Sequence, residues 1–106
     1  MLVKADLRGA DLRNASLIGA TLDSANLEGS NLSEAHLESA SLAYTNLRGA
    51  ALVRTDVYLA DLHFADLTGA NLLNLQNWTK ATSFIGAGVS EAQNPPEGFI
   101  DAVLGP

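Results

Sequence analysis

A short pattern of residues recurs at every fifth position through most of this chain. Leucine occupies thirteen positions at this spacing, from Leu7 to Leu72, and Val57 fills the single gap in the series. A small residue, in most units Ala, lies two positions before each of them, and Asp or Asn separates the two in nine of the fourteen units. Five residues turn an α-helix by about 500°, so the leucines would spiral around it, and on a continuous strand they would alternate between faces. The chain is therefore expected to bend once in every repeat, with the small residue and the leucine both buried.

The residues that follow each leucine carry a turn signal. Gly or Asn stands at the second position after the leucine in seven of the fourteen units. If the leucine opens a four-residue turn, this position is the third, where a type II turn requires a positive φ. The other corners carry larger or polar side chains, so the sequence predicts a second turn type at some of them. These corners are Ser24, Glu34, Ser39, Tyr44, Arg54, Leu59 and Phe64.

The motif Ala-(Asp/Asn)-Leu-X-X, repeated over residues 5–74, resembles that of the pentapeptide-repeat family. The resemblance implies an all-β fold, a right-handed quadrilateral β-helix in which four repeats close one coil. Residues twenty apart would then stack at about 4.8 Å, and the repeats would form roughly 3.5–4 coils. The Pro-Pro-Glu-Gly-Phe segment after the repeats also looks like that of cyanobacterial and chloroplast members of the family.

The chain divides into four predicted segments. Residues 1–4 form a lead-in, residues 5–74 the β-helix, residues 75–94 an irregular segment with two degenerate repeats, and residues 95–106 a short helical cap. Phe84 and Val89 are expected to continue the leucine column after an insertion. The prolines suit the first turn of the capping helix, and Glu97 its positive end. The side chains expected to cover the end of the stack are Phe99, Ile100, Val103 and Leu104.

Stacking by twenty also predicts columns of outward side chains. The column of residues 6, 26, 46 and 66 holds only Asp and Asn and is expected to form a hydrogen-bonded amide ladder. Arg8, Glu28 and Arg48 share another column, and their alternating charges predict ion pairs between coils. Both columns are interpreted as parts of the scaffold.

Composition and spacing give no enzymatic or ligand site. The chain has no Cys, and 6 basic against 12 acidic residues give a net charge of −6, which argues against binding to nucleic acid or anionic lipid. His36 and His63 fall in columns on different sides, so they are expected to be surface histidines that share no metal. Asp61 and Asp66 flank His63 but are each expected on a side of their own. The sequence therefore predicts no catalytic, cofactor or metal site, and a protein that is not an enzyme.

Large apolar residues at several outward positions break the pattern. Tyr44 and Phe64 are twenty apart and should stack at one corner. A patch that includes them is interpreted as covered by the segment after residue 74, as an interaction surface, or as scattered apolar residues without a role. The complete candidate patch is Tyr44, Val53, Tyr58, Leu59, Phe64 and Leu73.

These observations favour a non-enzymatic scaffold that acts through protein–protein contact or self-association. The alternative that the family suggests is an acidic mimic of duplex DNA that inhibits an enzyme such as gyrase. No run of 18 apolar residues and no signal-peptide core occurs in the sequence, which predicts no membrane partner and a cytoplasmic location. An organellar or lumenal origin stays open if the chain is a fragment.

Overall fold

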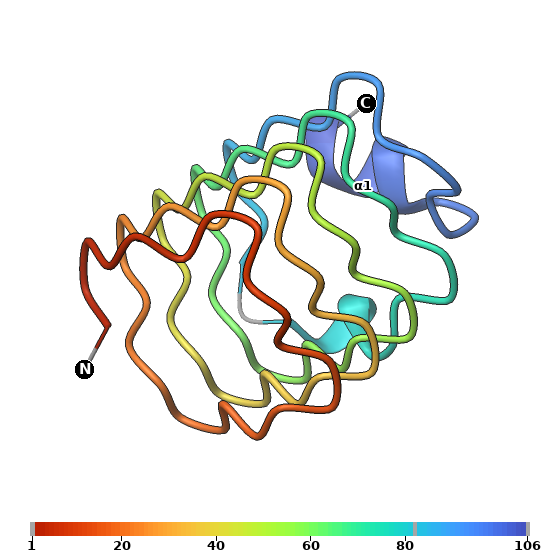
Figure 1. Ribbon diagram of the computed structural model, residues 1–106. Helices are drawn as coiled ribbons and strands as arrows, with labels where there is room; N and C mark the ends of the chain where they lie inside the picture. Colours follow the sequence, from red (N-terminus) through yellow and green to blue (C-terminus); the bar gives the residue numbers. More distant parts are fainter. Residues whose placement is uncertain (1, 82, 106) are drawn as a thin grey trace.

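The computed structural model describes residues 2–81 and 83–105, and its chain winds into a stack of coils (Figure 1). Isolated parallel β-bridges join neighbouring coils, beginning with the pair Asp6 and Asn26 and continuing to the pair Asn71 and Gln93. The paired residues are 20 apart as far as Asp56 and Gln76. Each bridge is short because a turn follows within the same repeat, and the described residues form no longer strand. One coil therefore contains four repeats of five residues.

Every corner in residues 5–74 has the same backbone conformation. The second residue after each leucine or Val57 has a φ between 54° and 69°, whether it is Gly, Asn or a larger residue. The next N–H donates to the carbonyl of the leucine, as Ala10 does to Leu7 at 3.1 Å. The prediction of a second turn type was wrong, because Tyr44, Phe64 and similar residues also adopt the left-handed conformation. That conformation is uncommon for bulky residues and costs about 1–2 kcal/mol.

The polar residue before the leucine stabilises the turn that follows. Asn26 and Asn46 accept hydrogen bonds at Oδ1 from the backbone N–H groups of Glu28 and Arg48, at 3.2 and 3.1 Å. The predicted amide ladder is not what these side chains form: among the described residues no hydrogen bond joins Asn26 to Asn46. The backbone N–H two residues further on is nearer to Oδ1 than the side chain in the next coil, so Oδ1 accepts a hydrogen bond from this N–H.

Arg8 pairs within its own repeat, which corrects the predicted column of ion pairs. Its Nε and Nη2 donate to the two oxygens of Asp6 at 2.8 and 2.7 Å, and no ion pair with Glu28 occurs among the described side chains. The two residues lie on either side of Leu7 and project to the same outward side, which permits this bidentate contact. Ion pairs that do cross between coils join Arg48 to Asp66 and Arg54 to Glu34.

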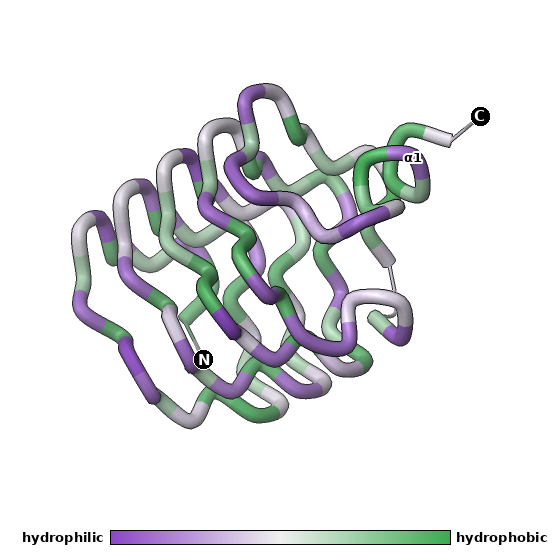
Figure 2. Tube along the Cα trace, turned by 90° about the vertical axis from the view of Figure 1, so that its right-hand side faces the viewer, coloured by the Kyte–Doolittle hydropathy of each residue, from purple (hydrophilic) through white to green (hydrophobic). Residues whose placement is uncertain are grey.

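The small residues and the leucines fill the inside of the coils, as predicted. Hydrophobic and hydrophilic residues alternate along each coil (Figure 2). The leucines of the five-residue series from Leu22 to Leu72 and Val57 are buried, whereas Leu7, Leu12 and Leu17 at the N-terminal end are only partly buried. Three polar residues also lie inside, and two of their hydroxyl groups donate to backbone carbonyls of the core. These residues are Ser30, Thr45 and Thr55.

The last part of the chain extends the stack with a changed step. Asp61 pairs with Ser83, 22 residues away, and the 3-10 helix η1 (Trp78–Lys80) lies in the stretch that accommodates the two additional residues. Val89 is buried and Phe84 packs against the core, so both continue the leucine column as predicted. Neither η1 nor the one α-helix is long and apolar enough to cross a membrane, in the part of the chain that the structure describes.

The α-helix α1 (Phe99–Leu104) is shorter than predicted and lies beside the last coil (Figure 1). Pro95 and Pro96 precede it and do not form its first turn, because Gly98 adopts a left-handed conformation at φ 81° and the helix begins after it. Phe99 is fully buried, and its ring meets those of Trp78 and Phe84 edge to face at 5.3 and 5.1 Å. Ile100 and Val103 are partly buried against the core, as expected, whereas Leu104 is exposed and does not make the predicted contact.

Candidate functional site

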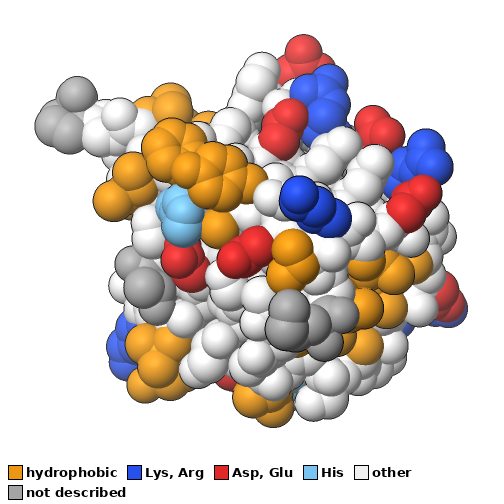
Figure 3. All heavy atoms as spheres, turned by 90° about the vertical axis from the view of Figure 1, so that its left-hand side faces the viewer, with side chains coloured by type: hydrophobic (Ala, Val, Ile, Leu, Met, Phe, Trp, Pro, Cys, Tyr) orange, Lys and Arg blue, Asp and Glu red, His pale blue; other side chains and the backbone are white. Residues whose placement is uncertain are grey.

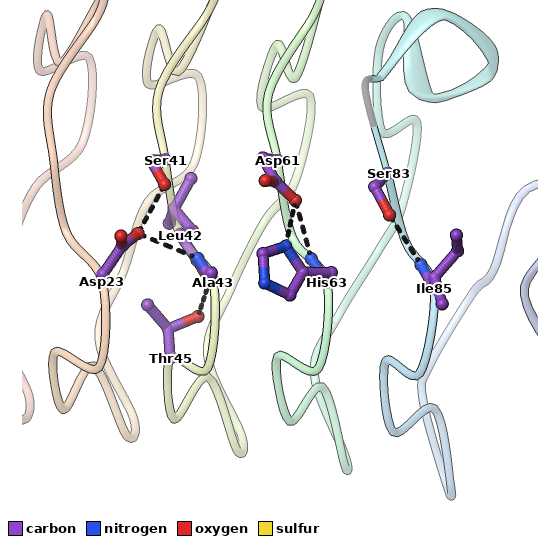
Figure 4. Close-up of polar contacts among 9 residues, drawn as sticks. All are labelled: Asp23, Ser41, Leu42, Ala43, Thr45, Asp61, His63, Ser83 and Ile85. Carbon is purple, nitrogen blue, oxygen red and sulfur yellow. Dashed lines mark hydrogen bonds and ion pairs between the residues drawn. The ribbon is translucent and has the colours of Figure 1, made fainter.

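Each repeat presents three positions outward: the residues on either side of the buried leucine, and the corner residue that follows them. The two residues that flank the leucine contact each other within single repeats, as Asp61 and His63 do (Figure 4). The β-bridges bring the same positions of neighbouring coils together, as for Ser41 and Asp61. The outer surface is thus a regular grid of side chains, in which contacts run either along a repeat or to the residue about twenty positions away.

The largest group of aromatic side chains on this grid lies at one corner. The rings of Tyr44 and Phe64 stack with 5.3 Å between centroids and 16° between planes. His63 meets both rings edge to face, at 5.2 Å from Tyr44 and 5.8 Å from Phe64. We call these three residues the aromatic corner. Tyr44 is 59% exposed and Phe64 52%. In the space-filling view, hydrophobic side chains gather around a histidine (Figure 3).

The segment after residue 74 covers one side of the aromatic corner only. Gly86 follows Phe64 in the stack, and a Cβ atom at Gly86 would overlap the Phe64 ring. The absence of a side chain at Gly86 therefore lets this ring lie against the backbone. Because Phe64 still exposes about half of its surface, this packing does not bury it. The aromatic corner remains accessible beside the tail.

The carboxylate of Asp61 holds His63, although the sequence predicted that Asp61 lies on another side of the coil. Its Nδ1 lies 2.7 Å from Oδ1 of Asp61, and its backbone N–H donates to the same oxygen at 3.1 Å (Figure 4). The expectation that Asp61 sits on a side of its own was wrong, since both residues flank Leu62 and project outward together. The separation of two residues was the signal that could have revealed this contact.

The Asp61–His63 pair has no hydroxyl nucleophile joined to it among the described residues. Ser41 lies in the neighbouring coil, but its Oγ donates to Asp23 at 2.5 Å, away from the imidazole (Figure 4). A Ser-His-Asp arrangement requires the hydroxyl to be hydrogen-bonded to the imidazole. The pair therefore orients His63 beside the two aromatic rings, where it widens the aromatic surface.

The other residues of the candidate patch occupy different corners. Tyr58 and Leu59 are exposed one corner away from Phe64, and Leu73 is exposed above the half-buried Val53. Units ten residues apart lie on opposite sides of a coil of twenty, so Val53 and Leu73 are diagonally opposite the aromatic corner. The structure thus brings Tyr44 and Phe64 into contact, and adds His63, but it divides the six residues among three corners.

Several outward carboxylates are held in the charged form by neighbouring donors. Hydrogen bonds from Arg13 lower the pKa of Asp11 to about 2, and the same contact with Arg8 lowers the pKa of Asp6. At Asp66, partial burial raises the pKa, but hydrogen bonds from Thr68 and Arg48 outweigh this effect and lower it. These carboxylates therefore act as acceptors in the scaffold.

His36 lies on a different face from His63. Its Nδ1 is 3.2 Å from Oε1 of Glu38, two residues further along the same repeat. The β-bridge to the next coil also brings Asp56 beside it. The sequence columns indicated the proximity of Asp56, but Glu38 was missed, although it shares the outward side of the same repeat.

A family model described as pentapeptide repeats matches eight copies, over residues 1–29, 22–57 and 37–74. No curated protein sequence matches the chain significantly. A solved pentapeptide repeat protein of the Arabidopsis thaliana thylakoid lumen is 29% identical, with a TM-score of 0.51, over 84% of this chain and 59% of its own.

Two further solved structures are similar over comparable lengths. HetL, a pentapeptide repeat protein involved in heterocyst differentiation regulation in the cyanobacterium Nostoc, is 30% identical, with a TM-score of 0.44, over 87% of this chain and 56% of its own. QnrB1, a plasmid-mediated fluoroquinolone resistance protein, is 20% identical, with a TM-score of 0.48, over 84% of this chain and 58% of its own. The chain thus spans less than two thirds of each of these three structures.

Proposed function

The chain belongs to the pentapeptide-repeat family, and from this premise we propose that it is a non-enzymatic scaffold that binds another protein chain through the aromatic corner. The family implies a right-handed β-helix. The proposal includes roughly 3.5–4 coils of repeats and α1 as the cap of the C-terminal end, as repeat stacks require. The candidate patch of Tyr44, Val53, Tyr58, Leu59, Phe64 and Leu73 is retained, with Tyr44 and Phe64 at its centre.

The observation that carries this proposal is the placing of two exposed aromatic rings at left-handed positions. Tyr44 and Phe64 have φ values of 60° and 56°, whereas Gly or Asn occupies the equivalent position in half of the repeats. A bulky residue in this conformation costs about 1–2 kcal/mol relative to the right-handed region. The fold does not need these side chains, since glycine suits the turn better. Other corners carry polar or aliphatic residues at the same φ, so what sets Tyr44 and Phe64 apart is that their exposed aromatic rings stack on each other.

The chemistry of the aromatic corner suits contact with a protein. Tyr and Phe are enriched in protein interfaces because a rigid ring buries a large area at a small cost in side-chain entropy. His63 and Asp61 border the two rings with polar groups. An apolar centre with a polar margin is the usual anatomy of an interface.

The charge arrangement weighs against the DNA-mimic alternative. Each of the four arginines forms an ion pair with an outward carboxylate, so a third of the acidic side chains are already neutralised on the surface. A surface that replaces the phosphates of a duplex needs continuous unpaired negative charge. A supercoiling assay with DNA gyrase tests the alternative directly, and inhibition at stoichiometric concentration would support it.

Two matched double variants test the proposal. Tyr44→Ser with Phe64→Ser removes the rings of the aromatic corner, and Val53→Ser with Leu73→Ser removes the apolar pair at the opposite corner. Static light scattering over a concentration series measures self-association, and each purified protein also serves as bait for partners, with circular dichroism as the check on folding.

We expect an association, with a second copy or with a partner, that the first double variant loses and the second retains. Equal association of all three proteins would overturn the aromatic corner as the contact surface. If the first double variant unfolds, the two rings serve internal packing and the proposal fails. A cytoplasmic location is part of the same proposal, and fractionation of the source cells checks it.

A further inference from the structure

We propose that His36, Glu38 and Asp56 form a binding site for a divalent transition-metal ion of the zinc type. This site lies on a different face from the aromatic corner, so the inference does not depend on the proposed function. In the described part of the chain, these are the three residues whose potential ligand atoms converge: one atom from each lies within 4.8 Å of the other two.

The repeat architecture places these three side chains together. His36 and Glu38 flank the buried Leu37 and project to the same outward side, with 3.2 Å between Nδ1 and Oε1. Asp56 lies beside His36 in the next coil, and a parallel β-bridge fixes the distance between their backbones. The site thus combines a contact along one repeat with a contact between coils.

The distances are compatible with coordination after a small adjustment. In a tetrahedral site, ligand atoms about 2 Å from a zinc ion lie about 3.3 Å from one another. Separations of up to 4.8 Å therefore have to shorten by up to about 1.5 Å, which rotation of the side chains can supply. His36 is exposed and its side chain is 55% accessible, so its ring can make this movement without disturbing the core.

Asp56 is oriented by partners of its own. Its Oδ1 accepts hydrogen bonds from the backbone N–H of Tyr58 at 3.0 Å and from Nδ2 of Asn77 at 2.9 Å. These two hydrogen bonds fix the orientation of the Asp56 carboxylate and leave its Oδ2 available to bind a cation. Carboxylate ligands of metal ions are commonly supported by such outer hydrogen bonds, which reduce the cost of ordering the ligand.

A shallow groove of about 210 Å³ borders His36 and Asp56 and provides space for water on the ion. His36, Asp56 and Gln76 line it, together with Arg54 and Glu34, which form an ion pair at 3.0 Å. Because Arg54 and Glu34 neutralise each other, the uncompensated charge at the site is that of Glu38 and Asp56. Two carboxylates and an imidazole form a mixed nitrogen and oxygen donor set, which suits zinc and its neighbours better than magnesium or calcium.

The test compares this site with the second His–carboxylate pair of the same protein. Isothermal titration with Zn²⁺, and with Mg²⁺ as the control cation, is performed on the wild type and on His36→Gln, Asp56→Asn and His63→Gln. His63 contacts Asp61 but has no third ligand among the described residues, so it reports what an ordinary surface histidine binds. The melting temperature is measured with and without Zn²⁺ as a second readout.

We expect one Zn²⁺ site in the wild type, loss of measurable binding in His36→Gln, and at least a tenfold weaker affinity in Asp56→Asn. His63→Gln should bind as the wild type does, and Mg²⁺ should not compete. Zn²⁺ should raise the melting temperature of the wild type, because the ion would join two coils and bind only the folded chain. Equal loss of affinity in His36→Gln and His63→Gln, unchanged affinity in Asp56→Asn, or absence of binding by the wild type would each overturn the proposal.

Discussion

Ser30 offers a sharp test of how the inside of the stack is packed. It lies in the small-residue column with Ala10 and Ala50 in the coils before and after it, and it is 1% exposed. Among the described residues, its Oγ is the buried side-chain oxygen without a hydrogen-bond partner. We therefore expect Ser30→Ala to stabilise the protein, since Ala already fills this position in the neighbouring coils.

The size of the effect follows from the hydrogen bonds to water that the Ser30 hydroxyl gives up when the chain folds. An unsatisfied buried hydroxyl costs about 1–3 kcal/mol, and removal of the oxygen leaves only a small void. We expect the free energy of unfolding to rise by about 1 kcal/mol, which corresponds to roughly 4–8 °C in the melting temperature of a domain of this size. Urea unfolding followed by circular dichroism measures the change, with the m-value as the check that the unfolding transition is otherwise the same.

Thr55→Val is the matched control, because Thr55 is equally buried but its hydroxyl is satisfied. Its Oγ1 donates to the carbonyl of Leu32 at 2.7 Å, across to another coil. This hydrogen bond contributes about 0.5–1.5 kcal/mol, so its removal should leave the protein no more stable than before. If Ser30→Ala lowers stability, or if Thr55→Val raises it as much, the packing described for the interior is wrong.

Three further changes test other parts of the structure. Leu47→Asp places an unpaired charge inside the stack and should abolish the cooperative melting transition. Gly86→Ala should destabilise the protein by more than about 1 kcal/mol, since the new Cβ both strains the left-handed backbone and displaces the Phe64 ring, and urea unfolding measures the loss. The carboxyl pKa of Asp11, followed by NMR titration, should be about 2 and return toward 3.8 in Arg13→Gln. Because this folded-state pKa is lowered, the contact stabilises the protein above about pH 4, and the contribution disappears as the pH falls through about 2. A normal melting curve for Leu47→Asp, an unchanged Gly86→Ala or an unshifted Asp11 would contradict the respective contact.

The sequence predicted the interior of the stack because the period of five admits few alternatives. Once helices and continuous strands are excluded, the small residue and the leucine must share the buried side, and the structure buries them from Leu22 to Leu72. The turn also followed from Gly and Asn at half of the corners. The error at the other corners arose because propensity is a local preference, and the hydrogen bonds of the stack impose one conformation on Tyr44 and Phe64 as well.

The candidate surface was only partly predictable. Stacking by twenty predicted that Tyr44 and Phe64 meet, which the geometry confirms. The contacts of His63 with Asp61, and of His36 with Glu38, were missed because they depend on how outward side chains turn within one repeat. A rule that the residues on either side of a leucine contact each other would have found both from their separation of two residues.

The central claim is that the aromatic corner binds another protein chain, and light scattering tests it most directly. The wild type and the Tyr44→Ser, Phe64→Ser double variant are compared across a concentration series, alone and with any partner that the wild type captures. The account predicts association of the wild type and its loss in the double variant, while both proteins melt cooperatively. Association that persists without the two rings, or a double variant that cannot fold, would contradict a contact surface at the aromatic corner.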